Sequence, residues 1–133
     1  MFNLNIREVH YDMGESSSAC CPIALAFVEK FLGTHPSATS VWKKNGVPLM
    51  RGDVIQVKSS YTRFWHPEKE KVYEYIHDEP IQDFIEKFDT WYDCSQHPID
   101  KPDEITLTFK KPWAVFDTKK TLYQYYNSYN IPE

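Results

Sequence analysis

Two segments of the chain carry apolar residues at the spacing of an amphipathic helix, and a long stretch without that spacing separates them. The first segment begins at Pro22 and the second at Pro80, and proline is favoured in the first turn of a helix. We therefore expect two main helices, and Gly33 is the residue at which the first should end. Their apolar faces consist of Ala24, Phe27, Val28, Phe31 and Leu32 in the first helix and of Ile81, Phe84, Ile85, Phe88 and Tyr92 in the second.

Short runs of β-forming residues lie before, between and after these helices. They alternate between apolar and polar residues, or they are rich in valine, isoleucine and aromatic side chains. The Asn45-Gly46 pair favours a tight hairpin turn, whereas Pro48 predicts a connection longer than two residues. We expect strands over residues 2–6, 40–42, 53–57, 71–76 and 105–109.

The order strand, helix, three strands, helix, strand predicts an α+β fold with a largely antiparallel sheet and the two main helices on one face. A chain of 133 residues is long enough to bury one core and too short for two separate domains. We expect a core domain over residues 1–111 and a tyrosine-rich extension over residues 112–133 that packs on it. A short helix is expected in this extension.

Charge is distributed unevenly along the chain. The net charge of −4 argues against nucleic acid as the main partner, because proteins bind it by neutralising phosphates. Residues 78–104 contain nine Asp and Glu side chains but only two Lys. This acidic block predicts a partner-binding face on the second helix, formed by Asp83, Glu86, Asp89 and Asp93. In the alternative interpretation these side chains only solvate the helix.

The segment before the acidic block has the opposite character. Residues 43–77 contain seven Lys and Arg side chains against four Asp and Glu. Trp42, Tyr61, Phe64 and Trp65 lie next to or among these basic residues. This pattern predicts a second surface that would bind an acidic partner or a nucleotide.

A site for an anion is predicted at the start of the first helix, where backbone N–H groups have no partner within the helix. The chain has only four glycines and lacks the glycine-rich phosphate loops, so a nucleotide would need this helix start. In the alternative interpretation the serines there only cap the helix. The candidate residues are Ser16, Ser17, Ser18 and Cys21, with Arg51 and Arg63 as charge partners and Trp65 as a stacking ring.

Cys20 and Cys21 lie at the same helix start, where a thiolate is favoured. A nucleophilic cysteine also needs an oriented base, and none of the five histidines can be assigned to that role from the sequence. We therefore expect no enzymatic activity, with a cysteine-dependent enzyme as an alternative. The favoured explanation of the pair is that they are small, buried and unreactive residues at the start of a core helix.

Cys94 and His97 have the spacing of half a zinc site, but no second half accompanies them, so neither a metal nor another cofactor is expected. No signal peptide or membrane-spanning segment is expected either, because the longest apolar run, residues 20–28, is short and contains Pro22. Three cysteines, two of them adjacent, fit reduced thiols better than disulfides. These features predict a cytoplasmic protein without a membrane partner.

Two short motifs resemble those of small uncharacterised proteins encoded by tailed phages. One is the helix start Cys21-Pro22-Ile23-Ala24-Leu25-Ala26, which has the form C-P-[IV]-A-x-A, and the other is Phe84-Ile85-Glu86-Lys87-Phe88-Asp89, with the form F-I-x-x-F-D. The resemblance covers about residues 2–110, and the segment after Pro112 departs from it. It implies a phage accessory protein that acts in the bacterial cytoplasm, and it implies no activity or site residue.

These observations lead to one main functional hypothesis. The chain is expected to be a non-enzymatic protein that binds and inhibits a host factor, such as an antiviral defence complex, in the manner of an anti-CRISPR or other anti-defence protein. One alternative is a sponge that sequesters a nucleotide immune signal at the first helix start. Another is a structural component that forms a homo-oligomer.

Overall fold

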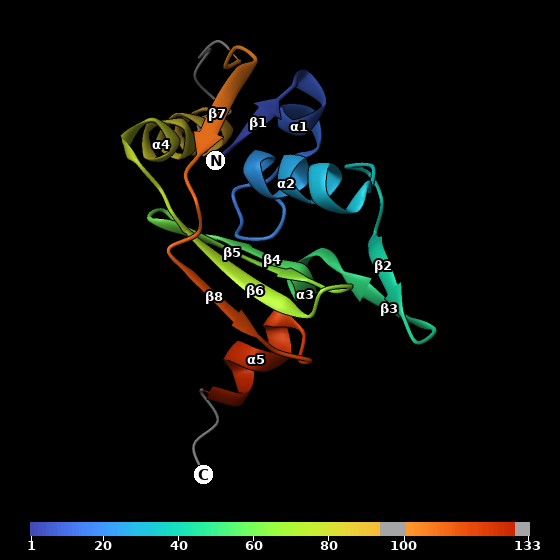
Figure 1. The fold of residues 1–133 in the computed structure, drawn as a ribbon. Coiled ribbons are helices and arrows are strands. Elements are labelled where there is room, and N and C mark those ends of the chain that lie inside the picture. Colours follow the sequence, from blue (N-terminus) through green and yellow to red (C-terminus); the bar gives the residue numbers. More distant parts are fainter. Residues whose placement is uncertain (94–100, 130–133) are drawn as a thin grey trace.

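The computed structural model of the chain describes residues 1–93 and 101–129, which form one small α+β domain (Figure 1). Every strand pair in these ranges is antiparallel, so the expected fold class is confirmed. The strands of the described residues form three sheets rather than one. Their orders are β1-β7, β2-β3 and β4-β5-β6-β8.

The four-stranded sheet lies in the middle of the domain. It contains β4 (Ile55–Val57), β5 (Tyr61–His66), β6 (Lys71–Ile76) and β8 (Ala114–Asp117). Neither β5 as a separate strand nor β8 was expected from the sequence. The backbone N–H of Val57 donates to the carbonyl of Ser18 at 2.7 Å, so the segment before the first main helix lies along the outer edge of β4.

Helix α2 (Pro22–Leu32) lies between this sheet and the strand pair of β1 (Phe2–Ile6) and β7 (Ile105–Phe109), as Figure 1 shows. The ring centroid of Phe27 lies 5.1 Å from that of Phe64 on β5 and 5.5 Å from that of Phe2 on β1. A helix covered on both sides needs an apolar surface all round. The seven consecutive residues from Pro22 to Val28 are accordingly buried.

The ends of α2 explain its length. Gly33 follows the helix with φ of 69°, and its N–H donates to the carbonyl of Glu29, so the expected helix end is confirmed. Pro22 occupies the first helical turn, as expected. The residue that caps the start is Cys21 rather than a serine, because the three serines lie in the preceding loop. Ser17 Oγ instead accepts a hydrogen bond from the N–H of Cys20 at 3.1 Å.

Helix α4 (Glu79–Asp93) is the second expected helix. It packs beside β7 and against helix α1 (Glu8–Met13), which the sequence did not predict. The ring of Tyr11 on α1 lies 6.0 Å from Phe84 and 6.3 Å from Phe88, measured between centroids. The expected single sheet is wrong, because the described strands form three sheets. Helix α2 contacts β1 and β4, whereas α4 contacts β7.

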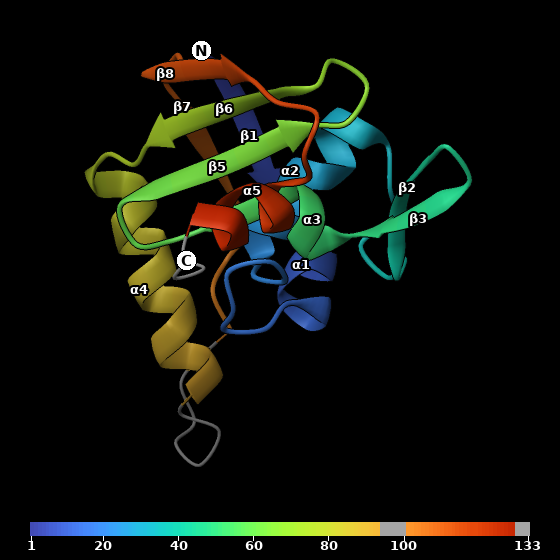
Figure 2. The same ribbon diagram turned by 90° about the horizontal axis from the view of Figure 1, so that it is seen from below.

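Strands β2 (Ser40–Lys44) and β3 (Val47–Met50) form a hairpin that projects from the rest of the domain (Figures 1 and 2). Its loop consists of Asn45 and Gly46 alone, with φ of 52° and 79°. The longer connection expected from Pro48 is therefore wrong. Helix α3 (Arg51–Val54) follows β3 directly and replaces the first part of the strand expected over residues 53–57.

Helix α5 (Leu122–Tyr129) covers the face of the four-stranded sheet opposite to α2 (Figure 1). Leu122 is buried, and the ring of Tyr125 lies 5.4 Å from that of Phe116 on β8. The short helix expected after Pro112 is thus present. Because the same segment also supplies β8, residues beyond Pro112 contribute both an edge strand and a covering helix to the sheet.

Candidate functional site

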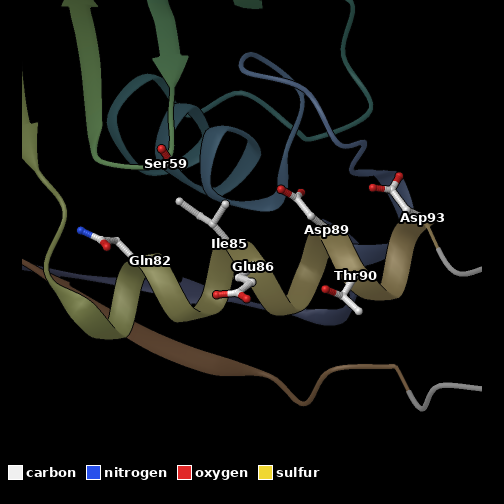
Figure 3. A pocket seen from close by; sticks show the side chains of 7 residues that line it. All are labelled: Ser59, Gln82, Ile85, Glu86, Asp89, Thr90 and Asp93. Carbon is white, nitrogen blue, oxygen red and sulfur yellow. The ribbon is translucent and has the colours of Figure 1, made fainter.

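A groove of about 590 Å³ runs along α4 (Figure 3). Its α4 residues recur every three or four positions, which places them on one face of the helix. The opposite wall is Ser59, in the turn that joins β4 to β5, and Figure 3 shows Ile85 and Asp89 pointing toward that side. The lining residues are Ser59, Gln82, Ile85, Glu86, Asp89, Thr90 and Asp93.

Three carboxylates give this groove its charge. Glu86 and Asp93 are exposed, and neither forms a hydrogen bond or ion pair with another described residue. Asp89 is half-buried and accepts a hydrogen bond from the hydroxyl of Ser16 at 3.0 Å. Ile85 is half-buried between them and supplies an apolar surface. We call Glu86, Asp89 and Asp93, together with Ile85, the acidic groove.

Asp83, the fourth carboxylate of the predicted acidic face, lies elsewhere on the helix. It lines a second cavity, of about 450 Å³, between α4 and the segment that leads into β7. Lys87 lines the same cavity, so a cation accompanies this carboxylate. The predicted face is thus divided between two concave surfaces, of which the acidic groove holds three of the four residues.

The serines of the predicted anion site have structural partners. Ser16 donates to Asp89, Ser17 accepts from the backbone of Cys20, and the Ser18 carbonyl accepts from Val57. These bonds hold the loop before α2 against both α4 and β4. The loop therefore joins three elements, which is a role that the sequence interpretation did not anticipate.

The predicted cationic partners of that site do not meet each other. Arg51 is 6% exposed, and its Nη2 donates to the carbonyls of Pro36 and Ala38 at 3.2 and 2.9 Å. Arg63 lies on β5, where its Nε donates to Glu74 Oε1 at 2.9 Å. Each guanidinium is thus held by its own set of neighbours.

Trp65 was predicted to stack on a nucleotide, and its placement excludes that role. Its side chain is fully buried, and its Nε1 donates to the carbonyl of Thr118 at 2.9 Å. Stacking would require the ring to leave the core, where a buried aromatic residue contributes several kcal/mol of stability, about 3–5 by comparison with alanine substitutions. The basic aromatic segment therefore contributes a core residue instead of an open nucleotide surface.

The two adjacent thiols have different surroundings. Burial raises the pKa of Cys21 to about 11, against backbone hydrogen bonds from Ala24 and Ile23 that act in the opposite direction. Cys20 is half-buried and forms no disulfide with another described residue. No histidine within the described part of the chain forms a hydrogen bond with either thiol, so the residues seen there contain no cysteine–histidine pair. The four described histidines are His10, His35, His66 and His77.

Residues 1–93 and 101–129 contain no cluster of three metal-ligating side chains. Cys94 and His97, the half-site noted in the sequence, lie outside those ranges. Within the same ranges, every helix is too short or too polar to cross a bilayer.

Sequence reasoning missed part of the acidic groove. Gln82 and Thr90 share the helical spacing of Glu86 and Asp93, so the same period could have identified them. Ser59 has no such signal, because it reaches the groove from a turn that is distant in sequence.

Comparison of the chain with protein-family models, with curated proteins and with solved structures finds no match.

Proposed function

We propose that this chain is a non-enzymatic accessory protein of a tailed phage that binds a basic surface of a host protein through the acidic groove. Binding would inhibit the host factor, such as an antiviral defence complex, in the bacterial cytoplasm. The observation that carries the proposal is the pair Glu86 and Asp93, which face the groove without a partner among the described residues. The phage origin rests on the resemblance of the two sequence motifs alone.

Charge complementarity identifies the chemistry of the partner. Carboxylates that lack an internal cation are solvated until a partner supplies lysine or arginine side chains. Clustered charges of one sign also increase the rate at which an oppositely charged protein is encountered. The half-buried Ile85 adds an apolar contact, and interfaces commonly place such a contact inside a polar rim.

The surroundings of the basic residues favour the acidic groove over the basic aromatic segment as the binding surface. In that segment Trp65 and Phe64 belong to the core, and Arg51 is buried. Arg63 is bound to Glu74, which neutralises much of its charge. A nucleotide signal is also disfavoured at the acidic groove itself, because carboxylates repel phosphates.

Affinity capture with charge-matched variants tests the proposal. The variant E86Q/D93N removes two negative charges from the groove, whereas E68Q/D117N removes two exposed charges from the β5–β6 turn and from β8. Each immobilised protein is incubated with host lysate, bound proteins are identified, and the salt concentration is raised stepwise. The wild-type chain and E68Q/D117N should retain the same host protein at low salt, and E86Q/D93N should lose it.

The purified partner then allows a quantitative measurement. Calorimetric titration should give affinities that agree for the wild-type chain and E68Q/D117N and a weaker affinity for E86Q/D93N, by about tenfold or more if each lost charge contact contributes about 1 kcal/mol. Equal affinities for the two double variants would contradict a role of the acidic groove. Failure of the wild-type chain to retain any host protein would contradict the proposed function itself.

A further inference from the structure

Arg51 is a buried cation with an incomplete set of hydrogen bonds. Its Nη2 binds two backbone carbonyls, those of Pro36 and Ala38, but its Nη1 has no hydrogen-bond partner in the part of the chain that the structure describes. Guanidinium has five N–H donors, and a buried donor without an acceptor lowers stability. Such a group in a folded protein calls for an explanation, and a redox or catalytic role is one of those known.

Cys20 is the side chain that interacts with this cation. Burial lowers the pKa of Arg51, and the interaction with the Cys20 side chain acts in the opposite direction. The sulfur nevertheless lies outside hydrogen-bond geometry for Nη1, which stays without a partner. Sulfur is a weak acceptor, so a neutral thiol satisfies a guanidinium poorly even at short range.

Local packing holds the two residues in this relationship. The N–H of Cys20 donates to Ser17 Oγ, and its carbonyl accepts from the N–H of Glu15 at 2.8 Å. The loop before α2 also contacts α3 beside Arg51. A Cβ atom added at Gly52 would lie 3.8 Å from the Cβ of Ala19, which is ordinary van der Waals contact. The neighbouring Cys21 is partly buried and packs against the core instead.

We propose that Cys20 is an oxidation site at which a peroxide converts the thiol into a sulfenate, and that Nη1 of Arg51 donates a hydrogen bond to the sulfenate oxygen. The deprotonated sulfur attacks one peroxide oxygen, so the S–O bond forms while the O–O bond breaks. The transferred oxygen keeps its hydrogen, so the first product is the sulfenic acid, and the leaving hydroxide takes up the proton that the thiol released and becomes water. The sulfenic acid then releases its proton to solvent and becomes the sulfenate. The sulfur is oxidised by two electrons and the peroxide is reduced by two.

The chemistry of the product explains why a guanidinium would be held there. A sulfenate oxygen is a charged acceptor, and hydrogen bonds between ionised groups are shorter and stronger than those between neutral ones. The unpartnered donor of Arg51 would thus gain an acceptor when the sulfur is oxidised. The raised pKa of Cys21 keeps its thiol protonated at neutral pH, and a protonated thiol reacts poorly with peroxide.

Trapping of sulfenic acid with a cyclic diketone tests the site. Trypsin releases residues 8–30 as a peptide that contains Cys20 and Cys21 but not Cys94, so the two thiols can be followed in the variants C21S and C20S. In folded protein treated with hydrogen peroxide, the adduct on this peptide should form about tenfold faster in C21S than in C20S. C21S should also react faster when folded than in urea, where access is complete.

Equal rates in the two variants would overturn the proposal, as would a folded C21S that reacts no faster than the chain in urea. The role of Arg51 is tested separately, in variants that keep this arginine. The Tm of C21S should rise after treatment with peroxide, because a buried donor gains its acceptor, while the Tm of identically treated C20S should not rise. An unchanged or lower Tm in C21S would overturn the contact between Arg51 and the sulfenate.

Discussion

Thr62 and His77 form a buried pair at the end of the β5–β6 ladder, with Thr62 Oγ1 2.6 Å from His77 Nε2. On the other side of the ring, His77 Nδ1 lies 3.1 Å from the carbonyl oxygen of Ser59. Because a carbonyl can only accept, Nδ1 carries the proton and Nε2 accepts the hydroxyl hydrogen of Thr62. The neutral ring is therefore fully bonded, and burial lowers the pKa of His77.

The first prediction is a loss of stability in mild acid. The unfolded chain binds a proton at His77 near pH 6.5, whereas the folded chain binds it only at lower pH. His77 should therefore contribute its whole stabilisation above pH 6.5. Below that pH the free energy of unfolding should decrease as the pH falls, by up to about 1.4 kcal/mol per pH unit. In H77Q the unfolding free energy should decrease less steeply with falling pH, because the proton that binds to His77 in the unfolded chain no longer contributes. Urea unfolding at several pH values measures the difference, and a fall in H77Q as steep as that in the wild-type chain would contradict the prediction.

The second prediction concerns two glycines with different surroundings. A Cβ atom at Gly14 would lie 2.5 Å from the carbonyl oxygen of His10 and 3.0 Å from Pro22 Cδ, so the backbone between α1 and α2 would have to shift. G14A should lower the free energy of unfolding by about 1–3 kcal/mol. G52A, whose Cβ would meet ordinary contact, should be neutral or stabilising by about 0.4–1 kcal/mol. Equal effects in urea unfolding would contradict the packing around Gly14.

The third prediction tests the two-residue hairpin. Gly46 has φ of 79°, a conformation that costs other residues about 1–2 kcal/mol. G46A should lower the free energy of unfolding by about that amount, or open the hairpin alone if the rest of the domain stays folded. N45G should leave stability nearly unchanged, because glycine adopts a positive φ readily. Hydrogen exchange of the β2 and β3 amides distinguishes local opening from global unfolding, and slow exchange in both variants would contradict the prediction.

The fourth prediction concerns the bond between Trp65 and Thr118. W65F keeps an aromatic ring in the core but leaves the carbonyl of Thr118 without the 2.9 Å bond from Nε1. The variant should lose about 1–3 kcal/mol of stability, from the missing donor and the smaller ring. W113F is the matched control, since Trp113 is 66% exposed and its loss should cost little. A comparable loss in both variants would show that the bond contributes nothing.

The sequence predicted the elements whose pattern depends on local spacing. The stripe of α4 is clear because one side of the helix meets the core and the other meets solvent. Gly33 marks the end of α2 because glycine adopts a positive φ at low cost. Three carboxylates of the acidic groove were likewise found because they follow the helical period.

Features that depend on tertiary contacts escaped prediction. Phe64 and Trp65 are adjacent on β5 and point to opposite faces, and both are buried because α2 covers one face and the segment after β8 covers the other. A strand covered on both faces shows no alternation, so its aromatic residues were interpreted as a surface. Pro48 misled for a different reason. It lies opposite Lys43, one pair from the turn, where a two-residue hairpin needs no N–H from the strand.

The pairing of β1 with β7 has a consequence for the order in which the domain can assemble. Asn3 and Thr108 are joined by a hydrogen bond although 105 positions separate them in sequence. During synthesis on a ribosome, the first strand must wait for its neighbour until most of this chain has been made. Until then one side of α2 lacks its cover, and contacts of such long range make folding slow. Association of the nascent chain with a chaperone during this interval would protect the exposed apolar helix.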